Sequence, residues 1–279
     1  MSRLLLCPPD YYGIEYEINP WMHRARQAER EVARAQWTSL RDTLQALGCR
    51  IDLLPAQPGL PDLVFTANAG LAVGGRVVLS SFRHKERRGE EAHFERWFAA
   101  SGFEVLRLPP NLVFEGEGDA LFGRDVLFCG YRFRSDIRAH HFLAELLNIL
   151  VISVELRDAR FYHLDTCFCP LPDGTVMWYP EAFDEYSQRA IREHSSGLIE
   201  APPEEAAQFA CNAVALDRHI ILPTGCPELC RALTDRGYHT HELPMSEFIK
   251  AGGACKCLTL FLPARERAGP ARSGRRPPA

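Results

Sequence analysis

Five residues with reactive or hydrogen-bonding side chains recur along the chain at a nearly constant spacing. The intervals are 51, 46, 47 and 45 residues, and they separate Asn68, Asp119, Asp165, Asn212 and Cys257. His163 precedes Asp165 by two residues, which puts both side chains on one face of an extended segment. A thiol and an imidazole can act as nucleophile and general acid–base, while carboxylates can hold a planar cation. A guanidinium fits best, because its fork of donors pairs with carboxylates bidentately.

The segments around these residues share one layout, in which a polar residue is followed by two short apolar runs with a turn between them. The turns have the glycine and aspartate content of tight hairpins and lie at 74–75, 123–125, 173–174 and 217–218. Helix-like stretches lie between the hairpins, at 22–47, 86–100, 136–150, 181–195 and from Cys226–Pro227 onward. Further apolar strands follow at 103–108, 150–156 and 239–243.

A supersecondary unit repeated about every fifty residues indicates a radial or solenoid architecture. An open stack of five such units would leave sheet edges exposed. We therefore expect an α/β fold closed into a five-bladed α/β propeller, with five ββαβ units around a central active site. The strand at Leu4–Cys7 would complete the unit that the C-terminus truncates. The alternative is a generic α/β sheet whose strands happen to be regularly spaced.

Composition limits the function classes. The chain has 279 residues, of which 46% are hydrophobic and 24% charged, as in globular proteins and unlike disordered or fibrous ones. The formal net charge of −4 argues against a general nucleic-acid or membrane-surface binder. We expect a single catalytic domain at 1–263 and a disordered basic tail at 264–279, because the tail has no apolar periodicity.

The expected location is the cytoplasm. No apolar run approaches the roughly 18–20 residues that span a bilayer, and the N-terminal apolar stretch is too short for a signal peptide. The ten cysteines should then be mostly reduced thiols. Cys167 and Cys169 could suggest a metal site, but no paired Cys-x-x-Cys accompanies them, so we expect no metal.

Cys257 and several arginines can each be interpreted as structural or as functional residues. Cys257 follows Gly252–Gly253, where backbone donors can stabilise a thiolate, whereas Cys255 is expected to be structural. Basic clusters are usually solvated surface. An inward Arg83 could instead pair with a substrate carboxylate, and the same holds for Arg132 and Arg134.

Four motifs, FTAN, EGEGDALF, HLDT and GGACKC, resemble those of the guanidine-modifying superfamily with the five-bladed pentein fold. That superfamily includes arginine deiminases, dimethylarginine dimethylaminohydrolases, amidinotransferases and arginine dihydrolases. The resemblance extends from about residue 3 to residue 262. HLDT followed by a C-terminal Gly-Gly-x-x-x-Cys is fairly specific when the order and the repeat phase also match.

The resemblance implies that Cys257 is the nucleophile, His163 the general acid–base and Asp165 a guanidinium-binding residue. Asp119 would be the further catalytic acid or acidic substrate contact. Glu115 or Glu117 could share that role, because EGEGD has one residue more than the EGGD of the family. The implied mechanism proceeds through a covalent thiouronium that water hydrolyses, without a metal or organic cofactor. The expected partner is a small guanidino substrate, not nucleic acid or a membrane, and a homo-oligomer stays open.

Asn68 departs from the deiminases, which have a carboxylate at this position of the motif, and from the Glu-Asp pair of dimethylarginine hydrolases. Losing that acid removes one charge-assisted contact to a guanidinium, about 1.5–3 kcal/mol. An amide both donates and accepts, so it tolerates a neutral ureido group better. Asn68 and the EYEINPWM segment around Asn19 are similar to the arginine dihydrolases. Asp62, shortly before FTAN, is a further candidate substrate contact.

The resemblance thus predicts hydrolysis of arginine to ornithine, ammonia and carbon dioxide, or to citrulline and ammonia if only one round occurs. The enzymatic alternative is a dimethylarginine dimethylaminohydrolase that gives citrulline and dimethylamine. An alternative of another class is a non-enzymatic pentein binding protein, since penteins include a ribosome-binding translation factor. Cys257 and His163 together argue against a pure binding role, because a binding module has no need of a nucleophile beside a base.

Overall fold

The structure is a computed structural model that describes residues 2–263. The basic tail predicted to be disordered, at 264–279, lies outside the described residues. No helix in the described part is both long enough and apolar enough to cross a membrane.

The strands form five separate three-stranded sheets, and each sheet is built in the same way. In one of them, β3 (Gly70–Val73) pairs antiparallel with β4 (Arg76–Leu79), and after helix α2 (Glu91–Ala100) the chain returns as β5 (Glu104–Leu106), parallel to β4. Three more sheets repeat this order, namely β6 (Ala120–Phe122), β7 (Leu127–Tyr131), α3 (Ile137–Leu147) and β8 (Val151–Glu155); β9 (Phe168–Pro170), β10 (Thr175–Trp178), α4 (Glu185–Glu193) and β11 (Gly197–Glu200); and β12 (Val214–Leu216), β13 (His219–Pro223), α6 (Pro227–Thr234) and β14 (His239–Leu243).

The fifth sheet combines the two ends of the described chain. Strand β15 (Leu260–Leu262) pairs antiparallel with β1 (Arg3–Leu6), in a register that sets Arg3 opposite Leu262. After helix α1 (Arg30–Ala46), β2 (Arg50–Leu53) runs parallel to β1. The prediction that the N-terminal strand completes the C-terminal unit is therefore confirmed.

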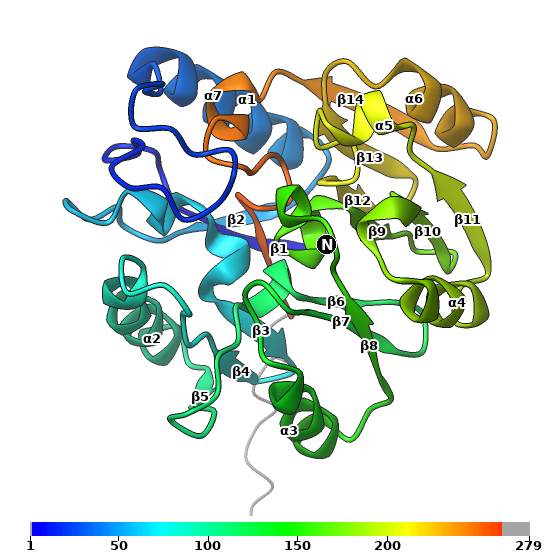
Figure 1. Cartoon of the computed structure of the whole chain (residues 1–279). Coiled ribbons are helices and arrows are strands. Elements are labelled where there is room, and N and C mark those ends of the chain that lie inside the picture. The colour runs from blue at the N-terminus through cyan, green and yellow to red at the C-terminus, as the bar shows by residue number, and fades with distance from the viewer. Residues whose placement is uncertain (1, 264–279) are drawn as a thin grey trace, which may run out of the picture.

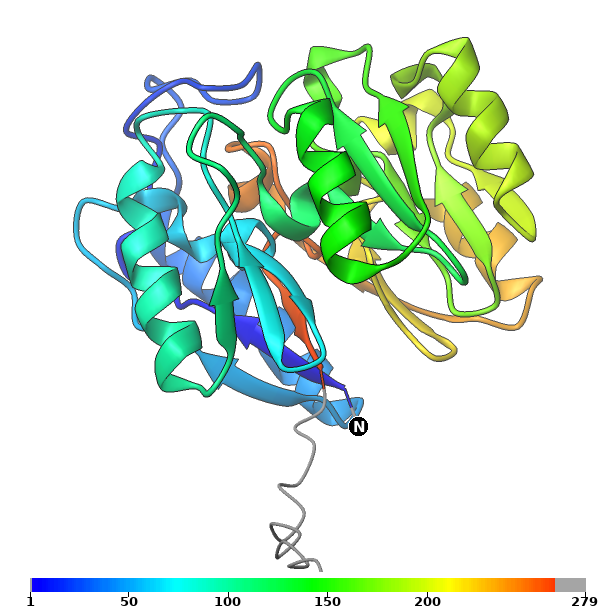
Figure 2. The ribbon, with the colours of Figure 1, turned by 90° about the horizontal axis from the view of Figure 1, so that it is seen from below.

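The five ββαβ units surround a common centre, with the innermost strands near it and the long helices on the outside (Figure 1). Isolated bridges join neighbouring units, between Ser81 and Phe114 and between Leu156 and Phe183. The five-bladed α/β propeller expected from the repeat is confirmed. Its described strands form a ring of separate sheets and do not close into one hydrogen-bonded barrel. Figure 2 shows the ring from below, with β1 and β15 side by side.

Helix α1 shows why the outer helices form. Its buried residues Ala33, Trp37, Leu40 and Leu44 recur every three or four positions, which gives one apolar stripe toward the sheets. The predicted helix at 22–47 starts too early, since α1 begins only at Arg30. The side chain of Gln27 explains the difference, because it donates to the carbonyl of Ile14 (2.8 Å) and accepts from its N–H (3.3 Å), which folds this segment back as a loop.

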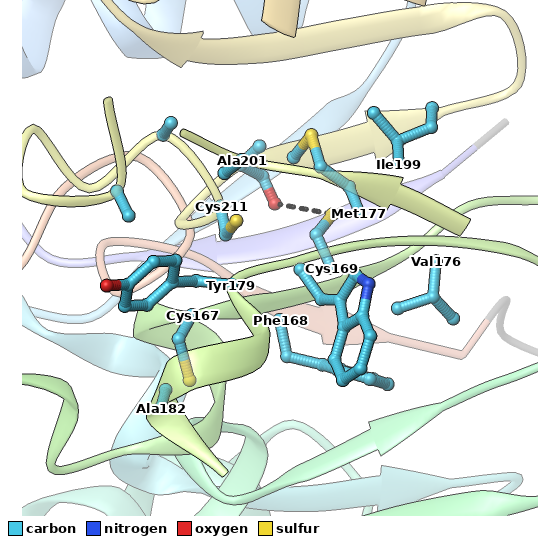
Figure 3. Close-up of a cluster of buried hydrophobic side chains, with 14 of the residues drawn as sticks. Cys167, Phe168, Cys169, Val176, Met177, Tyr179, Ala182, Ile199, Ala201 and Cys211 are labelled. Atoms are coloured by element: carbon cyan, nitrogen blue, oxygen red, sulfur yellow. Dashed lines mark hydrogen bonds between the residues drawn. The ribbon is translucent and has the colours of Figure 1, made fainter. Parts of the chain in front are cut away.

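The largest hydrophobic cluster surrounds the sheet β11–β10–β9 (Figure 3). Phe168, Met177 and Trp178 are almost fully buried there. Cys167, Cys169 and Cys211 point into the same cluster, where their thiols pack as small apolar groups. All ten cysteines are free. Among residues 2–263, no group of three or more His, Cys, Asp or Glu side chains is arranged to hold a metal ion.

Candidate active site

The recurring polar residues lie at the centre of the ring, where each innermost strand begins. Single turns of 3-10 helix precede three of these strands, at Thr66–Ala69, Gly116–Gly118 and Leu164–Thr166. They carry Asn68 and Asp165 and end at Asp119. All five in-phase residues have at most 3% of their surface exposed. The convergence expected from the repeat therefore places polar groups in the interior, where each must find a partner.

Cys257 lies between two of these residues. Its Sγ is 3.3 Å from Asp165 Oδ2 and accepts a hydrogen bond from Asn212 Nδ2 at 3.1 Å. Asn212 Oδ1 in turn accepts from the backbone N–H groups of Ala254, Lys256 and Cys257, at 3.0, 3.0 and 3.2 Å. This amide thus holds the loop that carries the thiol. Burial and the Asp165 carboxylate both raise the pKa of Cys257, so the thiol is protonated when no cation is near.

His163 is paired with Glu115. His163 Nε2 lies 2.7 Å from Glu115 Oε2, and the same oxygen accepts from Arg134 Nη1 at 3.1 Å. Burial alone would raise the pKa of Glu115, but Arg134 and His163 outweigh it and hold the pKa well below its usual range. Glu115 is therefore a permanent carboxylate that can orient the imidazole and stabilise its protonated form.

The other two acids of the EGEGD segment have different partners. Asp119 accepts from the N–H of Ser135 (3.1 Å), from its hydroxyl (2.6 Å) and from the N–H of Leu164 (3.1 Å). Glu117 accepts from Lys256 Nζ at 2.8 Å. Burial raises the pKa of Asp119 to about 6. Of these three acidic residues, only Glu115 is hydrogen-bonded to His163. The sequence alone did not show which of the three would have this role.

Ser135→Ala should cost about 1.5–3 kcal/mol of the free energy of unfolding, because the buried Asp119 loses its hydroxyl donor. Urea denaturation measures this loss. The matched control is Ser80→Ala: Ser80 is also buried, but its Oγ has no hydrogen-bond partner among residues 2–263, so its removal should change stability little. Equal losses in both variants would contradict this account of Asp119.

A small enclosed cavity lies in front of the thiol. Its free volume of about 10 Å³ is on the order of one water molecule. The cavity is lined by Asn19, Met22, Asp62, Phe65, Asn68, Arg87, Arg134, Tyr162, His163, Ala251 and Cys257. The amino-acid substrate expected from the motifs would need more room, so part of this wall would have to move for it to bind.

The segment around Asn19 covers the cavity and is tied to three places. Asn19 Nδ2 donates to the carbonyl of Ala251 (3.0 Å), and Trp21 Nε1 donates to that of Arg160 (2.8 Å). Arg134 Nη2 donates to the carbonyl of Ile18 at 3.1 Å. Opening of this segment would break these hydrogen bonds and the contact between the Trp21 and Phe209 rings, whose centres are 4.7 Å apart.

Of the predicted site residues, six line the cavity: Asn19, Asp62, Asn68, Arg134, His163 and Cys257. Asp165 lies directly behind the thiol. Asp119 does not reach the cavity, because Ser135 and Leu164 hold its carboxylate away from it. Arg83 is also outside: its side chain is exposed, and its Nε donates to the carbonyl of Arg134.

Arg87 also lines the cavity, although Arg83 was the only residue of the basic run at 83–88 that was expected to point inward. It is only 3% exposed and pairs bidentately with Glu90, with both N–O distances 2.8 Å. Its Nη1 donates to Asn68 Oδ1 at 2.8 Å, while Asn68 Nδ2 donates to the carbonyl of Glu115 at 3.2 Å. The amide of Asn68 is thus oriented at both ends. The signal in the sequence was the i, i+3 spacing of Arg87 and Glu90.

The family model described as "N,N dimethylarginine dimethylhydrolase, eukaryotic" matches residues 14–262, nearly the whole described chain. The chain belongs to this dimethylarginine dimethylaminohydrolase family. The family lies within the guanidine-modifying pentein superfamily expected from the motifs.

Relatives within the family differ in what they are named for. The bifunctional arginine dihydrolase/ornithine cyclodeaminase AgrE of Nostoc is 48% identical over 263 residues, which are 92% of this chain and 37% of AgrE. The chain therefore spans little more than a third of that relative. The dimethylarginine dimethylaminohydrolase of Mycobacterium tuberculosis is 36% identical over 258 residues, 92% of this chain and 85% of that protein.

Solved structures of the N-terminal domain of ArgZ, a cyanobacterial arginine dihydrolase, have the same fold. A cysteine-to-serine variant bound to its substrate superposes with a TM-score of 0.91 at 46% identity and covers 94% of this chain and 98% of that domain. An asparagine-to-serine variant of the same domain, with the same TM-score of 0.91, is covalently bound to a reaction intermediate.

Proposed function

We propose that this protein hydrolyses the guanidino group of arginine through a covalent Cys257 intermediate, and that it does so twice, giving ornithine, two ammonia and carbon dioxide. The observation that carries the proposal is the cavity in which Cys257, His163 and Asn68 face one another. The similarity to AgrE and to the ArgZ domain supports the same reaction. Because the chain spans only part of AgrE, the proposal concerns the guanidine chemistry alone.

Asp165 is suited to receive the guanidinium. It is fully buried, and its Oδ1 has no hydrogen-bond partner among residues 2–263. A buried carboxylate oxygen without a donor is costly, and two N–H groups of a guanidinium would supply what it lacks. The arriving cation also favours the thiolate of Cys257 beside it, so the substrate itself would generate the nucleophile.

The reaction then follows from the positions of Cys257 and His163. The thiolate adds to the guanidinium carbon, and the carbon–nitrogen bond breaks as His163 gives a proton to the departing ammonia. Water attacks the resulting thiouronium, His163 takes its proton, and the carbon–sulfur bond breaks to release citrulline and the thiolate. Glu115 keeps the imidazole oriented through both proton transfers. In a second round the ureido carbon is attacked in the same way, and the carbamate formed breaks down to carbon dioxide and ornithine.

Asn68 is what favours a second round. Arg87 fixes its Oδ1 and the backbone of Glu115 accepts from its Nδ2, so a neutral amide faces the reacting group. A carboxylate there would discriminate for the cationic guanidinium against the neutral ureido group, whereas an amide accepts both. The covalent intermediate in an asparagine-to-serine variant of the ArgZ domain supports a covalent reaction.

Arg134 and Arg87 are the arginines best placed for the α-carboxylate of the substrate. Both line the cavity and are almost fully buried. Arg134 lies with its guanidinium 4.5 Å from the centre of the Tyr162 ring, which fixes its plane. Asp62, which also lines the cavity, is a candidate to bind the α-ammonium of the substrate. Asn19 is a candidate substrate contact from the segment that covers the cavity.

The deciding experiment is product analysis with L-arginine, following citrulline, ornithine and ammonia with time. Ornithine with about two ammonia per arginine and little free citrulline is the expected result. Citrulline with one ammonia would make the protein a deiminase. Release of dimethylamine from dimethylarginine without turnover of arginine would favour dimethylarginine hydrolysis. The Mycobacterium relative supports that activity, whereas the absence of an acidic residue at Ala67 and Asn68 argues against it. Failure to act on any guanidine would favour the binding protein.

Asn68→Asp should shift the products toward citrulline and lower the ammonia released per arginine from about two toward one, because the new carboxylate disfavours a neutral ureido group. Quantifying both products at full arginine conversion tests this. The control is Asn148→Asp, at the C-terminal end of helix α3 and outside the cavity lining, which should leave the ratio unchanged. An unchanged ratio in Asn68→Asp would separate Asn68 from the choice between one and two rounds.

Arginine should bind more tightly as the pH rises through 7. Burial raises the pKa of Asp165 to about 7, and only its ionised form pairs with a guanidinium. Proton competition at that pKa gives about a tenfold increase in affinity between pH 6 and 8. Calorimetry on Cys257→Ser, which should turn arginine over too slowly to disturb the titration, measures the affinity. The double variant with Asp165→Asn should bind weakly at both pH values, and an equal tenfold rise in it would assign the effect to another group.

The remaining expectations stay proposals. A cytoplasmic location is supported by the ten free thiols, since a reducing compartment keeps cysteines unpaired. A homo-oligomer, a cofactor-free reaction and a single domain over 1–263 are likewise inferences from the sequence.

A further inference from the structure

A second and larger cavity lies along the innermost strands, beyond the catalytic centre. Its volume is about 410 Å³, within the range of small-molecule sites. The walls are mostly apolar and include Phe122, Phe168 and Phe261 from three different units. None of its lining residues lines the catalytic cavity. It reaches the hairpin turn at Gly123 and Arg124, whereas the catalytic cavity lies where the innermost strands begin. We call it the axial pocket.

An ion pair forms the polar part of the axial pocket. Lys256 Nζ lies 2.8 Å from Glu117 Oε2 and also donates to the carbonyl of Thr259 at 3.1 Å. Glu117 Oε2 further accepts from the N–H of Phe261 at 3.2 Å. Both charged residues are only 5% exposed, and both line the pocket. The ion pair is therefore part of the pocket wall and not surface charge.

Glu117 has an unused acceptor. Within residues 2–263 its Oε1 receives no hydrogen bond, although the side chain is buried and faces an open cavity. This oxygen borders the cavity and is free to accept from a ligand there, while burial of the side chain raises the pKa of Glu117. Lys256 has three donors, of which these two contacts occupy two. The pocket thus offers one acceptor and one donor of opposite charge side by side.

We propose that the axial pocket binds a free α-amino acid with an apolar side chain, at a site separate from that of the guanidino substrate. Its ammonium would donate to Glu117 Oε1, and its carboxylate would accept from Lys256. The apolar side chain would lie among the three phenylalanines, where burial of apolar surface stabilises the complex. A ligand with a single charge would contact only one member of this ion pair, whereas a zwitterion can contact both, so a zwitterion is the best match.

The test is calorimetric titration of the full-length protein with L-phenylalanine and L-leucine. Phenethylamine and 3-phenylpropanoate, which carry only one of the two charges, serve as matched ligands. Cys257→Ser with saturating L-arginine keeps the catalytic cavity filled during the titration. Ala215→Phe places a ring in the axial pocket, while Ala72→Phe adds the same ring to an innermost strand outside it.

The expected result is one saturable site per chain that persists with arginine bound. Each single-charge analogue should bind at least tenfold more weakly, and Ala215→Phe should abolish binding that Ala72→Phe retains. Thermal melts of both variants establish that they are folded. The proposal would be overturned by a lack of binding at millimolar amino acid or by displacement of the bound amino acid by arginine. Equal binding by Ala215→Phe and Ala72→Phe would also overturn it. None of these outcomes depends on turnover, so they are distinct from a failure of the proposed reaction.

Discussion

Cys257→Ser is expected to lower kcat for arginine by about 10³-fold or more, with no change in fold. A serine hydroxyl is far less ionised than a thiol, and no neighbouring group makes up the difference: Asp165, 3.3 Å away, opposes ionisation until a cation arrives. Initial rates of ammonia release, measured against the wild type at saturating arginine, quantify the loss.

The control is Cys255→Ser, two residues away on the same loop. Cys255 is fully buried in the hydrophobic cluster with Phe248 and Leu258 and does not line the cavity. Its replacement should lower the melting temperature and leave kcat within a few-fold of the wild type. Full activity in Cys257→Ser, or equal loss in the two variants, would rule out Cys257 as the nucleophile.

Glu115→Gln should lower kcat by about 10²-fold while KM changes little. Glu115 contacts His163 and not the cavity, so it is a positioning residue that acts through the imidazole. A neutral amide stabilises a protonated imidazole less than a carboxylate does. The pH–rate profile should therefore move toward acid, which a merely structural defect would not cause.

Glu205→Gln provides the comparison for Glu115→Gln. Glu205 is also a buried carboxylate, but it accepts from the N–H groups of Glu228 and Leu229 at the start of helix α6, away from the cavity. Its variant should lose stability only. A normal pH profile in Glu115→Gln, with kcat reduced in proportion to the folded fraction, would mean that Glu115 does not act on His163.

Most of the fold could be predicted from the sequence repeat. Polar residues in phase with hairpins predicted five units, the completion of the fifth by the N-terminal strand, and the meeting of Asn68, Asp165 and Cys257 at the centre. Two outer strands were not predicted, β2 (RIDL) and β11 (GLIE), because each is short and carries charge. Such strands take their conformation from the neighbouring strand more than from their own sequence.

The identity of the acid beside His163 depends on a local turn that spacing does not show. Gly116 has φ of +63°, and a Cβ there would come within 2.7 Å of the carbonyl of Gly70. Only glycine fits this close approach. We infer that the turn at Gly116 accommodates the extra residue of EGEGD and directs Glu115 toward His163. Asp119 keeps its place in the repeat and becomes a structural acceptor. Arg87 was missed for a similar reason, because its inward direction depends on the pairing with Glu90.

The pairing of β1 with β15 has a consequence for how the protein forms during synthesis. Four units consist of consecutive residues and can fold as the ribosome releases them. The fifth has to wait, because Arg3 finds its partner only when Leu262 has emerged. Cys257 lies directly before β15, so the loop that carries the proposed nucleophile is anchored only when this strand pairs with β1. A nascent chain would therefore carry His163 and Asp165 before Cys257 is in place, and the proposed reaction would begin only after the ring has closed.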